Sequence, residues 1–386
     1  MPQVAGFRGA LPVPGKASEV IAAGYTPKPG LADDIVARDA SRAVYRYHQV
    51  FAGPGRSFTR KSLYCAVQLT PYTEGQIRPH EHASVAGRDA ALAKIRQLGA
   101  HVEHVLMGFR DPATEVERLC RKPEANAPSF EVTTADGVVH KLWRIQEAET
   151  IGALRRYFAP KKLHVLDGHD RYAAMLAYRD ELAAKGEPPS YSSANYGLAC
   201  LTSLDDPSLA TAPRHRVLRG AGKREAALAA LGNRFIVDKL AGAAKDLKAQ
   251  FAALADTVAH QPAAVVVFAG EPDAWKLTLS PDVSPVAEGV QIHRALQKLD
   301  PIVLQHMLID RAFPKAESST DPNAETAIAQ LDKGADVVII TRPLSVAEIA
   351  HVDELGGMLP AGSTAFHPPL APHLVGFVID PDEDLV

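Results

Sequence analysis

Short apolar runs of strand length alternate with amphipathic helical patterns over the first 221 residues. Runs rich in apolar and β-branched residues predict strands at 61–70, 102–109, 138–145, 163–166 and 196–204. Helical patterns are predicted at 31–48, 87–98, 111–119, 149–158 and 170–185. This mixture predicts an α/β or α+β fold for the first part of the chain.

A second pattern begins at about residue 222, where the sequence becomes richer in Ala and more regularly helical. Helices are predicted at 222–233, 243–255, 299–309, 324–333 and 345–355. Strands are predicted at 235–237, 263–268, 275–279, 337–341 and 374–379. We therefore predict two domains of mixed α/β type, residues 1–221 and residues 222–386.

Composition narrows the class of protein. The 386 residues are 46% hydrophobic and 23% charged, which is typical of a soluble globular protein. Lys and Arg number 42 against 45 Asp and Glu, so the net charge of −3 gives no support to general nucleic-acid binding. No apolar run reaches the roughly 18 residues of a membrane helix, and the start of the chain does not have the pattern of a secretory signal. We expect a cytoplasmic protein without a membrane or nucleic-acid partner.

Three cysteines stand far apart in the sequence, at Cys65, Cys120 and Cys200. An odd number without a close pair argues against a disulfide framework and against a zinc ribbon. We expect three reduced, mostly buried thiols.

The densest group of chemically active residues is Asp167-Gly168-His169-Asp170-Arg171. A predicted strand leads into Asp167, Gly168 permits a close turn, and a helix begins within two or three residues. The first N–H groups of a helix are unpaired and attract phosphate or carboxylate. Arg171 adds a bidentate donor suited to phosphate, and Asp167 could hold Mg²⁺ or act as a base. The alternative is a capped helix in which Asp167 or Asp170 is the cap and Arg171 lies at the surface.

A second group is His80-Glu81-His82, after Pro79. Two histidines and a carboxylate could bind a metal with a third ligand from elsewhere. In an extended segment His80 and His82 share one face and Glu81 the other. Roles for Glu81 as a base and for the histidines as metal ligands therefore exclude each other, and a solvated loop is the structural alternative.

Two further segments are suited to anions. Arg214, His215 and Arg216 place two cations beside a titratable imidazole, although such a run is often solvated surface. Gly362, Ser363 and Thr364 could form an anion-binding nest, and a plain turn explains them equally well. The sequence contains no P-loop, no dinucleotide-binding G-x-G-x-x-G after a strand and no G-x-S-x-G elbow.

Over nearly its whole length the chain resembles a bacterial and archaeal family, the domain of unknown function 1015. The segments that carry the resemblance are GFRG, RPHE, LHVLDGHDRYAAMLAYRDEL, PRHR, LDPIVLQHML and LPAGSTAFHPPL, in this order. The family's Asp-Gly-His-His-Arg motif is similar to that of the ParB/sulfiredoxin superfamily, which includes ATP-using and CTP-using proteins and a ParB-like free serine kinase. In this chain the second His is Asp170, and two lysines of the family's late segments are absent.

The resemblance implies an N-terminal ParB/sulfiredoxin-like nucleotide-binding domain, with Mg²⁺ and ATP or ADP as cofactors. We predict a nucleotide-dependent phosphotransferase that acts on a small hydroxylated metabolite or amino acid. Glu81 would be the base, and Asp167 would hold the metal or help to activate the hydroxyl. The phosphates would bind to Gly168, His169, Asp170 and Arg171. The anionic part of the substrate or nucleotide would bind to His80, Arg214, His215, Arg216, Ser363 and Thr364.

Two other functions stay open at this point. One is a nucleotide-binding regulatory protein without turnover, and the other is a metal-dependent hydrolase that uses His80 and His82. The sequence also leaves a homodimer open. The phosphotransferase hypothesis predicts that Glu81, Asp167, His169, Arg171 and His215 line a common cleft.

Overall fold

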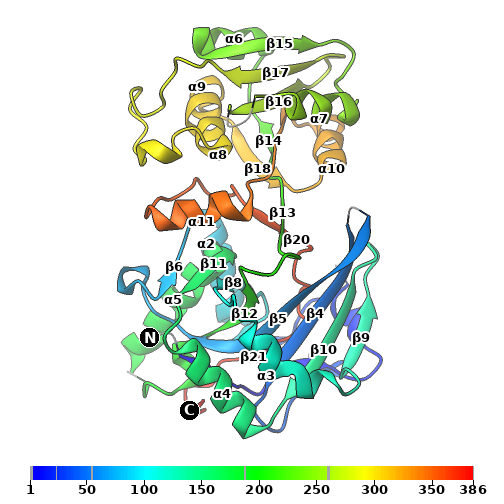
Figure 1. Cartoon of the computed structure of the whole chain (residues 1–386), viewed down its shortest axis with the longest axis vertical. Helices are drawn as coiled ribbons and strands as arrows, with labels where there is room; N and C mark the ends of the chain where they lie inside the picture. The colour runs from blue at the N-terminus through cyan, green and yellow to red at the C-terminus, as the bar shows by residue number, and fades with distance from the viewer. Residues whose placement is uncertain (1–2, 23, 54, 187, 259–260, 386) are drawn as a thin grey trace. The chain divides into compact units, whose positions relative to one another are not determined.

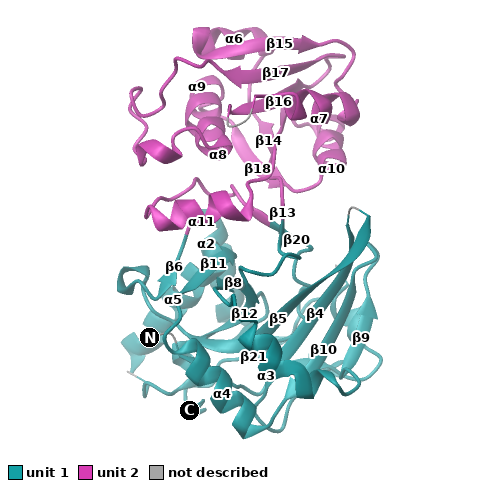
Figure 2. Cartoon of the chain, in the orientation of Figure 1, with its two compact units in different colours: residues 1–79, 83–210, 366–386 teal, residues 80–82, 211–365 magenta. Residues whose placement is uncertain are grey.

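The computed structural model describes residues 3–22, 24–53, 55–186, 188–258 and 261–385. The chain forms two compact units, which Figure 2 shows in different colours. Unit 1 contains residues 1–79, 83–210 and 366–386, and unit 2 contains residues 80–82 and 211–365. The predicted boundary after residue 221 does not follow these units, because residues 211–221 belong to unit 2 and residues 366–386 return to unit 1. The chain passes from unit 1 to unit 2 within strand β13 (Ala210–Ala212). It returns to unit 1 within strand β20 (Ala365–His367).

Unit 1 is built on a mixed sheet with the strand order β6-β11-β8-β12-β5-β4-β10-β9, and β1 pairs with β5 (Figure 1). Its strands are β1 (Val4–Ala5), β4 (Val44–Gly53), β5 (Arg56–Gln68), β6 (Ile77–Arg78), β8 (Val105–Phe109), β9 (Phe130–Thr133), β10 (Val139–Ile145), β11 (Leu163–Asp167) and β12 (Tyr196–Ser203). Strand β12 is parallel to β8, and β11 is antiparallel to β8. Smaller sheets pair β2 (Ala10–Pro12) with β3 (Val36–Arg38) and β7 (Ala100–His101) with β21 (Phe377–Val378).

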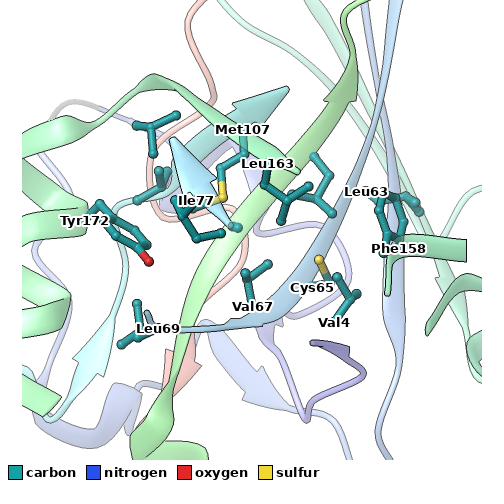
Figure 3. Close-up of a cluster of buried hydrophobic side chains, with 14 of the residues drawn as sticks. Val4, Leu63, Cys65, Val67, Leu69, Ile77, Met107, Phe158, Leu163 and Tyr172 are labelled. Atoms are coloured by element: carbon teal, nitrogen blue, oxygen red, sulfur yellow. The ribbon is translucent and has the colours of Figure 1, made fainter. Parts of the chain in front are cut away.

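The helices of unit 1 bury their apolar positions against this sheet. They are α1 (Ala17–Val20), α2 (Val85–Leu98), α3 (Glu115–Glu124), α4 (Ala148–Phe158) and α5 (His169–Lys185). Figure 3 shows part of the core, where Val67, Met107 and Leu163 of three strands lie in one buried cluster with Tyr172 of α5. The start of α5 is thereby held in place by the packing of its own first turns.

Unit 2 contains an antiparallel sheet with the order β15-β17-β16-β19-β14-β18. Its strands are β14 (His215–Arg219), β15 (Phe235–Leu240), β16 (Ala263–Phe268), β17 (Ala274–Leu279), β18 (Glu317–Asp321) and β19 (Val337–Ile340). Its helices are α6 (Arg224–Leu231), α7 (Leu247–Ala255), α8 (Asp300–Ile302), the π-helix η6 (Val303–Ile309), α9 (Asp310–Ala312), α10 (Ala324–Ala329) and α11 (Val346–Glu354). Alternate residues of β16 enter different clusters: Val266 packs toward α6 and η6, and Val265 packs toward α7 and α10. Both faces of the sheet are therefore covered.

Most predicted elements are present, but the helix predicted at 31–48 is wrong. Strand β3 lies within that segment, and β4 begins inside it at Val44. The side chains of Arg46 and His48 are buried in β4. Arg46 is paired with Glu117 and Glu124 of α3, and this pairing makes a charged residue compatible with a central strand.

Three other expectations concern the whole chain. The three cysteines are free and buried, as predicted. Among the described helices, none combines the length and the apolar character that a membrane span requires. Within the described residues there is also no group of three His, Cys, Asp or Glu side chains arranged to hold a metal ion.

Candidate functional site

The turn between β11 and α5 forms as the sequence predicts. Gly168 is the residue before the helix, and its φ of 94° is in the left-handed region that favours glycine. No side chain caps the helix at this position. The pairing of β11 with β8 shifts register between Val165 and Asp167, and such a bulge re-aims the side chain that follows it. Asp167 is therefore presented at the edge of the sheet, directly before the open start of a 17-residue helix.

Asp167 and Arg171 form an ion pair across this turn. Nη2 of Arg171 lies 3.1 Å from Oδ1 of Asp167, and the two side chains are 30% and 32% exposed. Arg171 also borders a small hollow with Lys94 and Glu103. Two partly exposed, oppositely charged groups thus stand at the helix start, and both remain accessible to a ligand.

Asp170 is directed away from this turn and toward another helix. Its Oδ1 accepts a hydrogen bond from the backbone N–H of Ser84 (2.5 Å), and its Oδ2 accepts one from Oγ of Ser84 (3.0 Å). Ser84 is the N-cap of α2, where its Oγ accepts from the N–H of Gly87 (3.1 Å). The cap of α5 that was predicted as an alternative for Asp167 or Asp170 is wrong, because no side chain caps α5 and the carboxylate of Asp170 supports the start of α2.

The other residues of the turn are mostly core. His169 is 5% exposed, and Tyr172 is fully buried, with its hydroxyl donating to the carbonyl of Thr70 (2.8 Å). Tyr172 and Met175 belong to the main cluster of unit 1. Arg171 and Asp167 are consequently the side chains of this motif that face solvent while remaining at the open helix start.

Glu81 lies in unit 2, in the nest predicted at Gly362, Ser363 and Thr364. Oε1 of Glu81 accepts from the N–H of Gly362 (2.6 Å). Oε2 accepts from the N–H of Ser363 (3.0 Å), the N–H of Thr364 (3.0 Å) and Oγ1 of Thr364 (2.8 Å). Burial raises the pKa of Glu81 above its ordinary value, and these hydrogen bonds oppose the shift. The nest therefore forms, and the anion that it holds is a side chain of the same unit.

Two arginines and a histidine lie beside Glu81 and residues 361–364. Arg216 is 4% exposed and donates to the carbonyl of Ala361 (3.2 Å). Burial lowers the pKa of Arg216 to about 10, and the nearby charge of Glu81 opposes this effect. Arg214 donates through Nε to the carbonyl of Thr364 (2.8 Å), and Nε2 of His80 lies 2.9 Å from Oγ1 of Thr364.

Two of the predicted histidines lie outside the group of residues around Glu81. His215 is the first residue of β14 and Arg216 is the second, and successive residues of a strand point to opposite faces. Its Nδ1 accepts from the N–H of Thr341 (3.1 Å), and its ring lies near Phe251 of α7. Burial lowers the pKa of His215 to about 4. His82 is exposed whereas His80 is 2% exposed, so the two do not share the environment that a metal pair requires.

The structure thus brings the predicted residues together in two groups. Asp167, Gly168 and Arg171 form one group in unit 1, while Glu81 and Arg216 belong to the other, in unit 2. A common cleft for both groups stays a prediction. Ser84 was missed, although a Ser directly before a helical pattern is an N-cap signal. Its partnership with Asp170, 86 positions away, has no local signal.

Comparisons with known proteins give one family and several solved structures. Residues 17–302 match the family described as "Protein of unknown function (DUF1015)". A conserved hypothetical protein from Pyrococcus furiosus is similar at 12% identity and a TM-score of 0.42, over 80% of this chain and 92% of that one. A free serine kinase in complex with AMP is similar at 12% identity and a TM-score of 0.41, over 84% and 93%. SbnI with a C-terminal truncation, from Staphylococcus aureus, is similar at 13% identity and a TM-score of 0.41, over 83% and 90%. No curated protein matches the chain.

Proposed function

This chain belongs to the DUF1015 family of proteins of unknown function, and we propose that it binds a nucleotide phosphate at the start of α5 and transfers a phosphoryl group to a small hydroxylated metabolite or amino acid. The observation that carries this proposal is the uncapped start of α5 at Gly168, with Arg171 beside it. A ParB/sulfiredoxin-like character of unit 1 is part of the same proposal.

The chemistry of the turn fits a phosphate. Gly168 lets a ligand approach the backbone, and a Cβ at this position would lie 2.7 Å from Nε of Arg171. The N–H groups of a first helical turn and the helix dipole favour an anion. The guanidinium of Arg171 can bind two phosphate oxygens at once. Gly168 and Arg171 would hold the phosphate, and His169 would contribute its backbone N–H to the same turn.

The turn also fits a divalent cation beside the phosphate. Mg²⁺ in nucleotide sites uses one or two carboxylates together with phosphate oxygens, so a group of three protein ligands is not required. Asp167 is the carboxylate available here, because Asp170 is engaged with Ser84. When bound, Mg²⁺ would neutralise charge on the phosphates. In the structure Arg171 forms an ion pair with Asp167. A phosphate that binds Arg171 would free the carboxylate of Asp167 to bind the cation.

One observation favours the second candidate, a nucleotide-binding regulator without turnover. Glu81, the predicted general base, is 8% exposed and accepts four hydrogen bonds inside unit 2. A general base must reach the proton that it removes, at about 3 Å or through one water. As the structure holds Glu81, its carboxylate stabilises the 360–364 segment.

The test compares Arg171→Ala with Arg96→Ala. Each arginine pairs with one carboxylate, but Arg96 pairs with Glu181 on exposed helical surface. Titration calorimetry with ATP, ADP or CTP, with and without Mg²⁺, should show binding by the wild type and by Arg96→Ala. In Arg171→Ala the loss of a charge-assisted bond should weaken binding about tenfold to a hundredfold. Absence of binding by the wild type, or equal affinity of the two variants, would overturn the phosphate site.

A second measurement separates the two candidates. The wild-type protein is incubated with the nucleotide that binds, Mg²⁺ and a pool of hydroxylated metabolites and amino acids, and the products are examined by mass spectrometry. A phosphorylated metabolite that Arg171→Ala does not form supports the phosphotransferase. Nucleotide binding without any phosphorylated product supports the regulator and refutes turnover on that pool.

A further inference from the structure

Unit 1 contains a pocket of about 250 Å³ that the proposed phosphate site does not use. It lies at the ends of β8 and β12, next to Phe109 and Ser203. Asp167 is opposite Leu106, three positions back along β8. The pocket and the turn at Gly168 are therefore toward different ends of the same strands.

Some residues of the pocket lining form a network of ion pairs. Arg46 donates to Glu117 and, through Nε, to Glu124 (2.5 Å). Lys61 donates to the other oxygen of Glu117 (2.6 Å). Arg46 is 1% exposed, so its charge is fixed in place by these partners. Both cations of the pocket lining are thus neutralised within the protein.

Three other residues of the lining are acidic: Asp111, Asp205 and Asp206. Asp111 accepts from the N–H groups of Glu115 and Val116 at the start of α3. Asp205 accepts from the N–H of Asp111 (2.6 Å) and pairs with Arg110, whose side chain is 66% exposed.

Asp206 differs from these neighbours. Its Oδ1 accepts from the N–H and the Oγ of Ser208 (2.8 and 2.7 Å), and among the described residues no cation pairs with it. The pocket lining contains four carboxylates and two cations, an excess of negative charge. The floor is apolar, with Phe109, Val116 and Leu201.

We propose that this pocket binds a small aliphatic amine, with its ammonium group on Asp206 and its hydrocarbon chain on the apolar floor. An ammonium beside a carboxylate in a partly enclosed site forms a charge-assisted hydrogen bond. The negative excess repels anions, so a free nucleotide or a phosphate is the wrong chemistry for this pocket.

The experiment uses 1,4-diaminobutane, with 1,4-butanediol and succinate as neutral and anionic compounds of the same length. Binding to the full chain is measured by calorimetry and by ligand-observed NMR. We expect 1,4-diaminobutane alone to bind. Binding of the diol with equal affinity, binding of succinate, or no binding of the diamine at millimolar concentration each overturns the proposal.

Two variants that move affinity in opposite directions complete the test. Asp206→Asn keeps an oxygen for Ser208 but removes the charge, and should weaken diamine binding about tenfold or more. Lys61→Met leaves Oε2 of Glu117 without its cation, which increases the negative excess of the lining, and should tighten binding several-fold. Asp89→Asn, an equal change of charge on α2, serves as the control and should leave the affinity unchanged. Unchanged affinity in both Asp206→Asn and Lys61→Met, with melting curves like that of the wild type, also overturns it.

Discussion

Replacing Asp170 by Ala tests whether this residue serves α2 or a ligand. The substitution removes both acceptors from Ser84, one from its backbone N–H and one from its hydroxyl. Ser84 is half-buried, so its hydroxyl can turn to water, but its N–H has no other protein partner among the described contacts. We therefore expect the main loss to come from the backbone bond.

The magnitude follows from that bond. A hydrogen bond to a charged group contributes about 1.5–3 kcal/mol. Asp170 is also an acidic residue in the first turn of α5, which contributes about 0.3–1 kcal/mol through the helix dipole. The better helix propensity of Ala offsets this second effect. The net loss in the free energy of unfolding is about 1.5–3 kcal/mol, or roughly 3–12 °C in the Tm of a unit of this size.

Gly87 provides an internal check on this assignment. A Cβ at Gly87 would lie 1.9 Å from Oδ2 of Asp170 and 2.6 Å from Oγ of Ser84. Gly87→Ala should therefore lower the free energy of unfolding of the wild type, although Ala in a helix normally stabilises by about 1 kcal/mol. In the Asp170→Ala background the carboxylate is gone and Ser84 can rotate, so the same substitution should become neutral or stabilising.

The assay is thermal unfolding followed by circular dichroism for the wild type, both single variants and the double variant. The non-additivity of the double-mutant cycle measures the steric coupling directly. An unchanged Tm in Asp170→Ala, or an effect of Gly87→Ala that is the same in both backgrounds, would refute the role of Asp170 in holding α2. If Asp170 instead restrained ligand binding, Asp170→Ala would change nucleotide affinity without changing Tm.

Three other predictions concern unit 2. Glu81→Ala removes the carboxylate that accepts hydrogen bonds from residues 362–364 and lies near the buried Arg216. Urea unfolding should therefore show a loss of about 3–5 kcal/mol in the free energy of unfolding, whereas the exposed Glu354→Ala should change it little. Gly362→Ala should destabilise more than Gly356→Ala, since both have a left-handed φ but only at Gly362 would the Cβ lie 3.0 Å from Arg216; equal melting temperatures would contradict this. Burial lowers the pKa of His215 to about 4, so the unfolded chain binds a proton first as the pH falls from about 6.5, and stability should decrease by at most roughly 3 kcal/mol down to pH 4. His215→Gln should lose this part of the pH dependence in urea titrations, and an identical pH dependence would refute it.

The local chemistry of the two groups could be read from the sequence because it depends on neighbouring residues. The turn at Gly168 requires only a strand, a residue without Cβ and a helix, and those signals are contiguous. The nest at 362–364 likewise needs Gly followed by two residues with free N–H groups, and it formed. Apolar runs such as Ala263–Phe268 fix buried strands for the same local reason.

The partners of charged residues were not readable, because they come from distant parts of the chain. Arg46 of β4 pairs with Glu117 and Glu124, which lie 71 and 78 positions further along the chain, so no local signal marked it as a buried residue of a strand.

The sequence by itself therefore determined the mixed α/β class, most elements, the buried cysteines and the shape of the turn at Gly168. Only the tertiary structure decided which hydrogen-bond partner within the chain each polar group has. Glu81 is held by the nest instead of standing free, Asp170 accepts hydrogen bonds from Ser84, the N-cap of α2, and His215 faces away from Arg216. Secondary structure follows from local sterics and periodicity, whereas the commitment of a carboxylate or imidazole depends on which donors folding brings within hydrogen-bonding distance.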